Sequence, residues 1–342
     1  MDCMHCNFAN SDPLSGTGLR AFSSYSASLI QYHRRALGLF CMTTLSGPQL
    51  VQYLQRINVP HRTAKQLTPC LSTLAELQFA HLKAIPFENL SLHHPKALER
   101  KEGISCKLEE VFKKLVQKPR GGYCFEQNTL FAAVLRTLSF SVYTAAGRVV
   151  QSQDAEGHIN HLTGTEHMVV VVIFDDGSRW LTDVGFGSQV PRRPLRIDQL
   201  DLDPQQDSKT YGYRHRLRPG LTHSSLEVSD ADTQMNPERA GCYLQCTNSE
   251  GHWKDLYFFH VKECFEQDFE IYNWWCATAP QAAMKNMTIA AIQTEHGRIT
   301  YDGKTVKVFE CAAAETKVAE TVKLESQGQT DEELQSKMSI AM

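Results

Sequence analysis

Two adjacent glycines, Gly121 and Gly122, stand directly before a stretch with the apolar spacing of a helix. Apolar residues recur there at intervals of three and four, at Phe131, Val134, Leu135 and Leu138, which is the period of a helix packed along one side. Glycine tolerates the dihedral angles of a sharp turn and lets another backbone or a ligand approach closely. The sequence therefore predicts a tight turn that delivers Cys124 to the first turn of a buried helix.

The predicted place of Cys124 makes its thiol a candidate nucleophile. Unpaired N–H groups and the helix dipole favour an anion at a helix N-terminus, so we expect the pKa of this thiol to be lowered toward neutrality. The same N–H groups can receive the charge of a developing oxyanion. A buried structural cysteine after an ordinary Gly-Gly turn is the alternative, and a nearby base is needed to decide against it.

A hairpin over residues 167–184 provides both a base and a carboxylate. Residues 167–174 form a β-branched apolar run that suits a buried strand. Residues 175–177 read Asp-Asp-Gly and are typical of a turn, after which residues 179–184 return as a second strand.

The length of the loop sets which residues face each other. If residues 175–177 form a three-residue loop with glycine in the left-handed conformation, Asp183 lies opposite Val169. Val169 is two residues from His167, so His167 and Asp183 share one face as diagonal neighbours. Together with Cys124 they form the arrangement that activates a thiol for acyl transfer. Taken singly, the histidine could be a satisfied core residue and the aspartate a strand-end residue.

These residues belong to four ordered motifs, and the motifs resemble those of the arylamine N-acetyltransferase family. They read Ile-Pro-Phe-Glu-Asn-Leu at 85–90, Arg-Gly-Gly-Tyr-Cys-Phe-Glu-Gln-Asn at 120–128, Glu-His at 166–167 and Asp-Val-Gly-Phe-Gly at 183–187, with Asn-Trp-Trp following at 273–275. The resemblance extends from about residue 45 to the C-terminal region. It implies that Cys124, His167 and Asp183 form a catalytic triad.

The resemblance also implies an α+β fold with a cysteine-protease-like triad core. An N-terminal helical bundle that carries the nucleophile is expected over residues 42–139, and a central antiparallel β-barrel that carries the base and the carboxylate over 140–255. A C-terminal α/β lid is expected over 256–342. Residues 1–41 precede the resemblance and are expected to be a disordered extension.

The activity implied by the resemblance is a ping-pong acyl transfer. His167 would draw the proton from Cys124, an acyl-CoA would acylate the sulfur, and an arylamine, hydrazine or arylhydroxylamine would attack the acyl-cysteine. Acetyl-CoA or another acyl-CoA is the expected cosubstrate, and no tightly bound cofactor is expected. The open alternatives are an N-malonyltransferase acting on xenobiotic or plant-derived arylamines, a cysteine hydrolase or transglutaminase-like enzyme, and a catalytically silent binding module.

Further residues are expected to support this site. By resemblance and position, the substrate-binding candidates are Phe125, Phe186, Gly187 and Thr278. The two phenylalanines adjoin catalytic motifs and could wall an acceptor pocket, although protein cores use the same residue types. Arg120 and Glu88 are expected to form an ion pair that anchors the loop before the nucleophile, with a surface role as the alternative for each.

Two departures from the family pattern matter. The interval from the histidine to the aspartate is one residue longer than expected, but the additional residue falls in the loop and preserves the pairing. Ala282 and Met284 stand where relatives carry a serine and a phenylalanine, so the preferred acyl group stays open. A malonyl group would need a basic partner such as Arg148 or Arg192.

Composition argues against several other classes of protein. A formal net charge of -3 over 342 residues gives no basic excess for nucleic acid, and no apolar run approaches the length of a membrane span. Eleven cysteines without regular spacing indicate reduced thiols in the cytoplasm. The pairs Cys3/Cys6 and Cys242/Cys246 lack a matching second pair, so no metal site is expected. We expect a monomer that acts on small molecules.

The remaining elements follow from pattern. A first helix is expected from residue 47, with an apolar stripe at Leu50, Val51, Leu54 and Ile57. A second is expected after a capping box formed by Thr73 and Glu76. Residues 199–239 are polar and are expected to include long surface loops. Near the C-terminus, the expected elements are strands at 288–292 and 305–310 and a helix near 331–338.

Overall fold

The described part of the chain begins at Thr43. The structure is a computed structural model that describes residues 43–60, 62–63, 65–101, 103–154, 157, 159–198, 213–221, 240–247, 251–312 and 315–341. All elements discussed below belong to one structural unit, Thr43–Met342. The expected extension at 1–41 and the Cys3/Cys6 pair lie outside the described residues.

Helices form the N-terminal part of this unit. They are α2 (Gly47–Arg56), α3 (Leu71–Ala84), α4 (Pro95–Glu99), α5 (Leu108–Phe112) and α6 (Cys124–Thr137). A π-helical turn, Lys113–Gln117, continues α5. α6 is buried over most of its surface because α5 and the adjoining sheet pack around it. The helix predicted after the glycine pair is therefore the centre of this part.

Two expected details of the helices are wrong. Val51 is 55% exposed, and the buried stripe of α2 instead includes Tyr53, whose hydroxyl bonds to His81 of α3. α3 begins at Leu71 with Cys70 as N-cap, so the expected capping box is not formed. The helix starts two residues before Thr73, which was the expected N-cap. Thr73 therefore lies inside the first turn, where it is buried.

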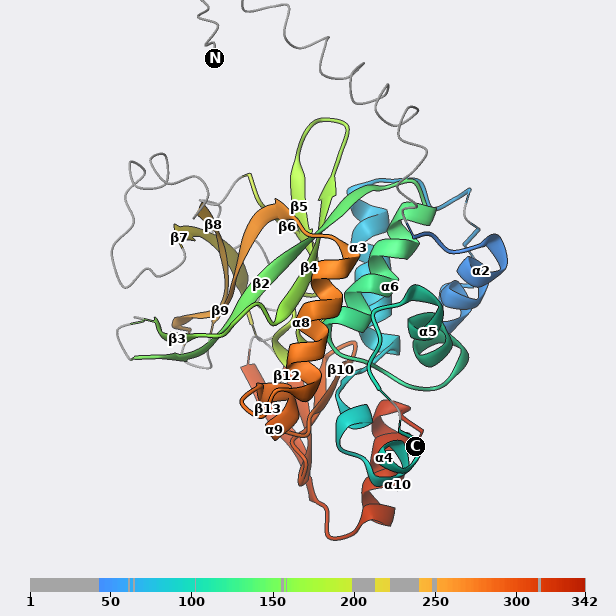
Figure 1. Cartoon of the computed structure of the whole chain (residues 1–342), viewed down its shortest axis with the longest axis vertical. Coiled ribbons are helices and arrows are strands. Elements are labelled where there is room, and N and C mark those ends of the chain that lie inside the picture. Colours follow the sequence, from blue (N-terminus) through green and yellow to red (C-terminus); the bar gives the residue numbers. More distant parts are fainter. Residues whose placement is uncertain are drawn as a thin grey trace, which may run out of the picture. The chain divides into compact units, whose positions relative to one another are not determined.

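An antiparallel sheet forms the centre of the fold (Figure 1). Its strands are β2 (Ser141–Gln153), β3 (Ile159–Leu162), β4 (His167–Ile173), β5 (Arg179–Thr182), β6 (Leu195–Arg196), β7 (His215–Leu221), β8 (Ala240–Thr247) and β9 (Trp253–Glu263). The order is β6-β5-β4-β2-β9-β8-β7, with β3 paired to β2. The edge strands β6 and β7 also contact each other, so the sheet curls into a nearly closed barrel.

The barrel differs in one place from the sequence expectation. β9 continues through the expected boundary at residue 255 and ends at Glu263. β7 lies within residues 199–239; apart from residues 213–221, this stretch, which was expected to include long surface loops, lies outside the described residues. Its Pro219 and Gly220 disfavour a strand in a sequence pattern, but β7 pairs with β8 alone and stands at the end of the strand order. Such an edge position tolerates proline.

The hairpin of β4 and β5 has the predicted register. The observed pairs run from Ile173 opposite Arg179 to Val170 opposite Thr182, which puts the next residue, Asp183, opposite Val169. The three-residue loop is closed by a hydrogen bond from the amide of Gly177, whose φ is 82°. A positive φ at this position is the left-handed conformation that the prediction required.

After His167, β4 is apolar because both of its faces are buried. Val170 and Val172 pack into the helical core, whereas Val169 and Val171 pack into the interior of the barrel. A strand covered on both sides reads as a continuous apolar run. His167 has the same parity as Val169 and therefore faces the barrel side.

The C-terminal part completes the fold. Helix α8 (Glu266–Thr278) lies between the barrel and α6 and is followed by the short α9 (Ala283–Asn286) (Figure 1). A second antiparallel sheet has the order β1-β10-β11-β12-β13. Its strands are β1 (Phe87–Glu88), β10 (Ala290–Gln293), β11 (Gly297–Tyr301), β12 (Thr305–Ala312) and β13 (Glu315–Lys323), and α10 (Gln327–Met338) ends the chain. The two expected strands correspond to β10 and β12, and the expected helix to α10.

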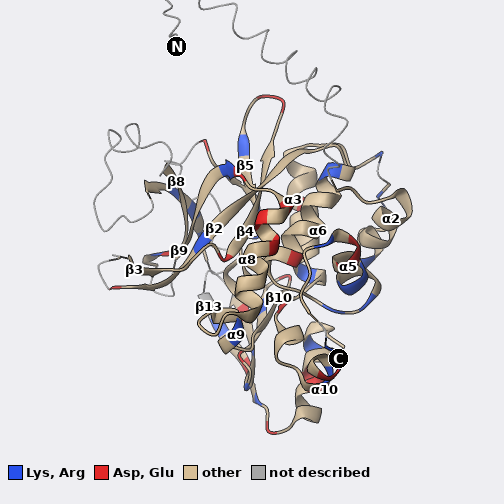
Figure 2. Cartoon of the chain, viewed as in Figure 1, with Lys and Arg blue, Asp and Glu red and all other residues tan. Residues whose placement is uncertain are grey.

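Basic and acidic residues are interspersed along the helices and strands (Figure 2). Acidic residues gather at the start of α8, where Asp268 caps the helix by accepting the amide of Phe265 at 2.9 Å. Negative charge at a helix N-terminus is favourable. None of the helices in the described residues is both long and apolar enough to cross a membrane.

The Gly177→Ala variant tests the conformation of the hairpin loop. Space is not limiting at this position, since a Cβ would meet nothing within 4 Å. The left-handed conformation costs a non-glycine residue about 1 kcal/mol, so urea denaturation should show a free energy of unfolding lowered by about that amount. Gly177→Asn should lose less, and Gly103→Ala, at an open position without positive φ, should lose nothing. Equal losses in all three variants would contradict the assignment.

Candidate active site

The glycine pair packs against the segment that leads into β1. A Cβ on Gly121 would lie 2.0 Å from the carbonyl oxygen of Pro86. The same carbonyl accepts hydrogen bonds from the amide of Gly122 at 3.2 Å and from Nε2 of Gln127 at 2.7 Å. The glycines therefore allow the close backbone approach that the sequence predicts, and they hold the turn before the nucleophile in place.

Cys124 is the first residue of α6, as predicted, and is 6% exposed. Its Sγ lies 3.5 Å from the carbonyl oxygen of Glu166, the residue directly before His167. From the other side, a Cβ on Gly185 would lie only 2.6 Å from the Cα of Cys124. The nucleophile is thus held between the start of β4 and the segment that follows β5.

The pKa of Cys124 is raised well above that of a free thiol, which corrects the expectation from the helix terminus. Burial is the largest cause, and negative charge on Cys276 and Asp183 adds to it, while the backbone amides of Met168 and Phe125 act in the opposite direction. The free-energy cost of removing water from a thiolate here is larger than the stabilisation that the helix N-terminus gives to its negative charge. The resting sulfur is protonated, so its reaction requires a base.

His167 and Asp183 meet across the hairpin. Nε2 of His167 lies 2.8 Å from Oδ2 of Asp183, and both side chains are buried. Burial raises the pKa of Asp183, but the charge of His167 and the hydrogen bonds from His167, Asn128 and Gly185 together lower it below its usual value. Asp183 is therefore ionised and accepts a proton-bearing Nε2, which leaves Nδ1 as the ring nitrogen free to act as a base.

Asp183 has three further donors that complete its surroundings. The hydroxyl of Tyr257 donates to Oδ2 at 2.9 Å, and Nδ2 of Asn128 and the amide of Gly185 donate to Oδ1 at 2.9 and 2.7 Å. Asn128 also donates to the carbonyl of Met168 at 2.6 Å. Because Asn128 lies one helical turn after the nucleophile, it links α6 directly to the carboxylate and to β4.

The sequence did not identify Tyr257 or the role of Asn128. Asn128 was visible in the motif at 120–128, and its spacing from Cys124 places both on one face of the helix. Tyr257 is 74 residues away from Asp183 along the chain. It reaches the site only because β9 pairs with β2, which in turn pairs with β4.

Aromatic rings pack around the base. The ring of Phe186 lies edge-on to His167 at a centroid distance of 5.0 Å and to Tyr257 at 4.7 Å. Phe186 is half-buried and so borders both the base and the surface. Phe125 has an exposed fraction of 0% and packs against the rings of Tyr123 and Phe269. Of the two expected pocket residues, only Phe186 therefore contacts the base directly.

Gly187 and Thr278 contact residues other than the triad. Gly187 has a φ of 65° and would place a Cβ 3.4 Å from the ring of Phe87, so it serves a tight turn after the aspartate motif. Thr278 is exposed at the end of α8, where its hydroxyl donates to the carbonyl of Trp274 at 2.6 Å.

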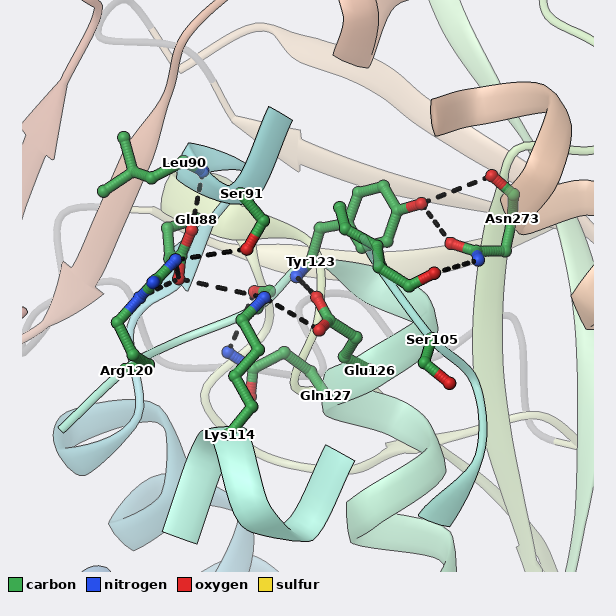
Figure 3. Close-up of polar contacts among 12 residues, drawn as sticks. Glu88, Leu90, Ser91, Ser105, Lys114, Arg120, Tyr123, Glu126, Gln127 and Asn273 are labelled. Carbon is green, nitrogen blue, oxygen red and sulfur yellow. Dashed lines mark hydrogen bonds and ion pairs between the residues drawn. The ribbon is translucent and has the colours of Figure 1, made fainter. Parts of the chain in front are cut away.

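A buried ionic network supports the turn before Cys124 (Figure 3). Arg120 donates to Oε1 of Glu88 through Nε at 3.1 Å and through Nη2 at 3.0 Å, so the expected ion pair is present. Lys114, on the π-helical turn, donates to Oε1 of Glu126 at 2.8 Å, and Oε2 of Glu126 accepts the amide of Tyr123 at 3.1 Å. Because Glu88, Arg120 and Glu126 are buried and Lys114 is largely covered, the network resists displacement of the turn.

The two positions that depart from the family pattern lie in α9 and at its N-cap. Ala282 is buried, and the side chain of Met284 packs against the apolar cluster that includes Cys124. Of the two basic candidates, Arg148 donates to the carbonyl of Thr163 at 3.1 Å. Arg192 is buried and donates to Gln293 at 3.0 Å, away from the triad.

Two cysteines lie on barrel strand β8. Cys242 and Cys246 lie in the apolar interior of the barrel. Within the described ranges, no group of three or more His, Cys, Asp or Glu residues is arranged to hold a metal ion.

Sequence comparisons relate the chain to known proteins. A family model described as N-acetyltransferase matches residues 70–342. The arylamine N-acetyltransferase of Mycolicibacterium smegmatis is 30% identical over 265 residues, which cover 77% of this chain and 83% of that protein. The N-malonyltransferase FDB2 of Fusarium pseudograminearum is 26% identical over 328 residues, which cover 84% of this chain and 91% of that protein.

Solved structures show the same fold. The arylamine N-acetyltransferase from Salmonella typhimurium superimposes with a TM-score of 0.68 and 26% sequence identity, over 87% of this chain and 92% of that chain. The Mycobacterium marinum arylamine N-acetyltransferase in complex with CoA gives a TM-score of 0.67 and 27% identity, over 85% of this chain and 92% of that chain.

The Gly185→Ala variant tests how closely Cys124 is held. The added methyl would lie 2.6 Å from the Cα of Cys124 and 2.9 Å from Nδ2 of Asn128, so the nucleophile must shift. We expect the rate of Cys124 alkylation by iodoacetamide, followed by peptide mass mapping, to fall about 10- to 100-fold. Gly164→Ala is the matched control, since its nearest contact lies at 3.9 Å. An unchanged rate in Gly185→Ala would contradict the geometry.

The His167→Gln variant tests the base through the pH profile of the same alkylation. Because burial raises the pKa of Cys124, the thiol alone is unreactive near neutral pH and becomes reactive as pH rises. A functioning base should make the unmodified chain about 100-fold faster than His167→Gln at pH 7, with the gap closing at higher pH. Profiles that superimpose would show that His167 does not activate the thiol.

Proposed function

The chain belongs to the arylamine N-acetyltransferase family, and on that premise we propose that Cys124, His167 and Asp183 are its catalytic residues. Its activity is the transfer of an acyl group from an acyl-CoA to an arylamine. The observation that carries the residue assignment is the 2.8 Å contact between His167 and Asp183, next to a cysteine at the start of α6.

In the first half-reaction the acyl group moves from coenzyme A to the protein. Nδ1 of His167 takes the proton of Cys124, and the sulfur attacks the carbonyl carbon of the acyl-CoA thioester. The bond to the coenzyme A sulfur then breaks, and the imidazolium returns the proton to that sulfur. Asp183 accepts the Nε2 proton throughout and stabilises the imidazolium, so the base keeps one orientation.

In the second half-reaction the acyl group moves to the amine. The arylamine nitrogen attacks the carbonyl carbon of the acyl-cysteine, the carbon–sulfur bond breaks, and His167 takes the proton lost by nitrogen before passing it to the cysteine sulfur. The amides at the start of α6, including that of Cys124, are positioned to donate to the oxyanion. The products are an N-acyl arylamine and a restored thiol.

Phe186 is the residue that we assign to the wall of the acceptor site. It is half-buried and its ring touches the ring of His167, so an aromatic amine can pack on it while its nitrogen reaches the acyl-cysteine. Phe125, which is fully buried, has a packing role next to Cys124 in this proposal. Thr278 is exposed at the end of α8 and is proposed to contact the coenzyme, and Gly187 shapes the turn after Phe186.

The surroundings of Cys124 favour a small uncharged acyl group, so we propose acetyl-CoA as the preferred donor. The sulfur lies in an apolar cluster with Phe125, Met168 and Phe269, and the negative charge of Asp183 acts on it. A malonyl carboxylate would be desolvated there next to like charge. In the same proposal the chain acts as a cytoplasmic monomer on small molecules, with neither nucleic acid nor membrane as a partner.

Intact-mass analysis after mixing the chain with acetyl-, propionyl- and malonyl-CoA tests nucleophile and donor together. One acyl group should add to the unmodified chain, fastest from acetyl-CoA, and leave again when an arylamine is supplied. Cys124→Ala should take up no acyl group. Cys70→Ala is the matched control, because hydrogen bonds from Ser72 and Thr73 lower the pKa of that partly exposed thiol to about 7 and make it a chemical competitor.

The outcomes separate the alternatives. Fastest uptake from malonyl-CoA would overturn the donor assignment and identify an N-malonyltransferase. No adduct from any donor, combined with cleavage of amide substrates, would identify a cysteine hydrolase. An adduct that persists in Cys124→Ala and disappears in Cys70→Ala would overturn the nucleophile assignment.

A further inference from the structure

The nucleophile shares its apolar cluster with other cysteines. Cys106, Cys124 and Cys276 are all buried members of this cluster, and the structure shows each of them as a free thiol. The acyl-transfer mechanism uses Cys124 alone. The other two therefore have no assigned role in the chemistry, although they lie beside its most reactive group.

The contacts of α8 place Cys276 next to the N-terminus of α6. Tyr123, directly before the nucleophile, donates through its hydroxyl to the side chain of Asn273. Nε1 of Trp275 donates at 3.2 Å to the carboxylate of Glu166, whose carbonyl oxygen lies 3.5 Å from Sγ of Cys124. Cys276 follows these two residues on α8 and is 1% exposed, so its side chain points inward between the contacts that bracket the nucleophile.

The electrostatic effect of Cys276 on Cys124 agrees with the position of Cys276 next to the start of α6. Charge on Cys276 is the largest cause after burial that raises the pKa of Cys124. Cys106 also contacts α8, since its Sγ donates to the carbonyl of Phe269 at 3.7 Å. Charge on Cys106 adds to raising the pKa of Cys276, but Cys106 is not among the groups that shift the pKa of Cys124. Of the two unused buried thiols, we therefore take Cys276 as the partner of the nucleophile.

We propose that Cys276 is a resolving cysteine that captures oxidised Cys124 in a reversible disulfide. The thiolate of Cys124 attacks a peroxide oxygen, the O–O bond breaks, and a sulfenic acid and water or an alcohol form. The sulfur of Cys276 then attacks the sulfur of the sulfenic acid, releasing water and forming the S–S bond. Two thiols are thereby oxidised and one peroxide is reduced. A dithiol reductant reverses the bond.

The disulfide would protect the nucleophile from irreversible loss. A sulfenic acid without a partner thiol proceeds to sulfinic and sulfonic acids, which thiols do not reduce. Burial raises the pKa of Cys276, with charge on Glu166 and on Cys106 adding to it, so the thiolate of Cys276 is scarce near neutral pH. We therefore expect the disulfide to form faster as pH rises.

The test treats the full chain with hydrogen peroxide and maps its peptides by mass without reduction. The expected product is a peptide pair linked through Cys124 and Cys276, and dithiothreitol should restore alkylation of Cys124 by iodoacetamide. In Cys276→Ala the link should be absent, and peroxide should convert Cys124 to sulfinic and sulfonic acid with no recovery. Cys276→Ser serves as a second variant if the alanine chain fails to fold.

Cys106→Ala is the matched control and should behave as the unmodified chain. A link from Cys124 to Cys106, or full recovery of oxidised Cys276→Ala by dithiothreitol, would overturn the proposal. The proposal rests on the proposed nucleophilic role of Cys124, but its test measures peptide masses and not acyl transfer. If the chain forms the disulfide but takes up no acyl group, the proposed function is wrong and this inference still holds.

Discussion

The carboxylate of Asp183 is wholly buried and accepts hydrogen bonds from His167, Tyr257, Asn128 and the amide of Gly185. Leaving a buried charge without its partners costs about 3–5 kcal/mol, a large part of the stability of a protein, so these donors hold the charge in the folded chain. They come from β4, β9, α6 and the segment after β5. The charge that orients the catalytic base therefore also fixes the helical part against the barrel.

Cys124 has ion pairs on one side and apolar side chains on the other, and the two sides act on it differently. On one side, two ion pairs hold the turn that precedes α6: Arg120 with Glu88, and Lys114 with Glu126. On the other, Phe125 and its apolar neighbours exclude water from the sulfur. Exclusion of water keeps Cys124 protonated at rest, so its reactivity depends on His167 rather than on the helix terminus alone.

The structural features that could be predicted from sequence depend on local backbone geometry. The register of the β4–β5 hairpin depends only on the length of its loop and on the two-residue period of a strand, so Asp183 could be placed opposite Val169 from sequence. The start of α6 followed from glycines and helical spacing. Prediction failed where packing decided: the buried stripe of α2 uses Tyr53, because its hydroxyl reaches His81 of α3.

The sequence by itself predicted Cys124, His167 and Asp183 as nucleophile, base and orienting carboxylate, and it indicated the family, because motifs and short-range spacing carry that information. Only the tertiary structure decided that Tyr257 contacts Asp183, that Cys276 shares the apolar cluster of Cys124, and that the pKa of Cys124 is raised. These outcomes depend on the pairing of β2 with β9, on the path of α8 and on the exclusion of water. Each is a property of segments far apart in the chain, which no local pattern encodes.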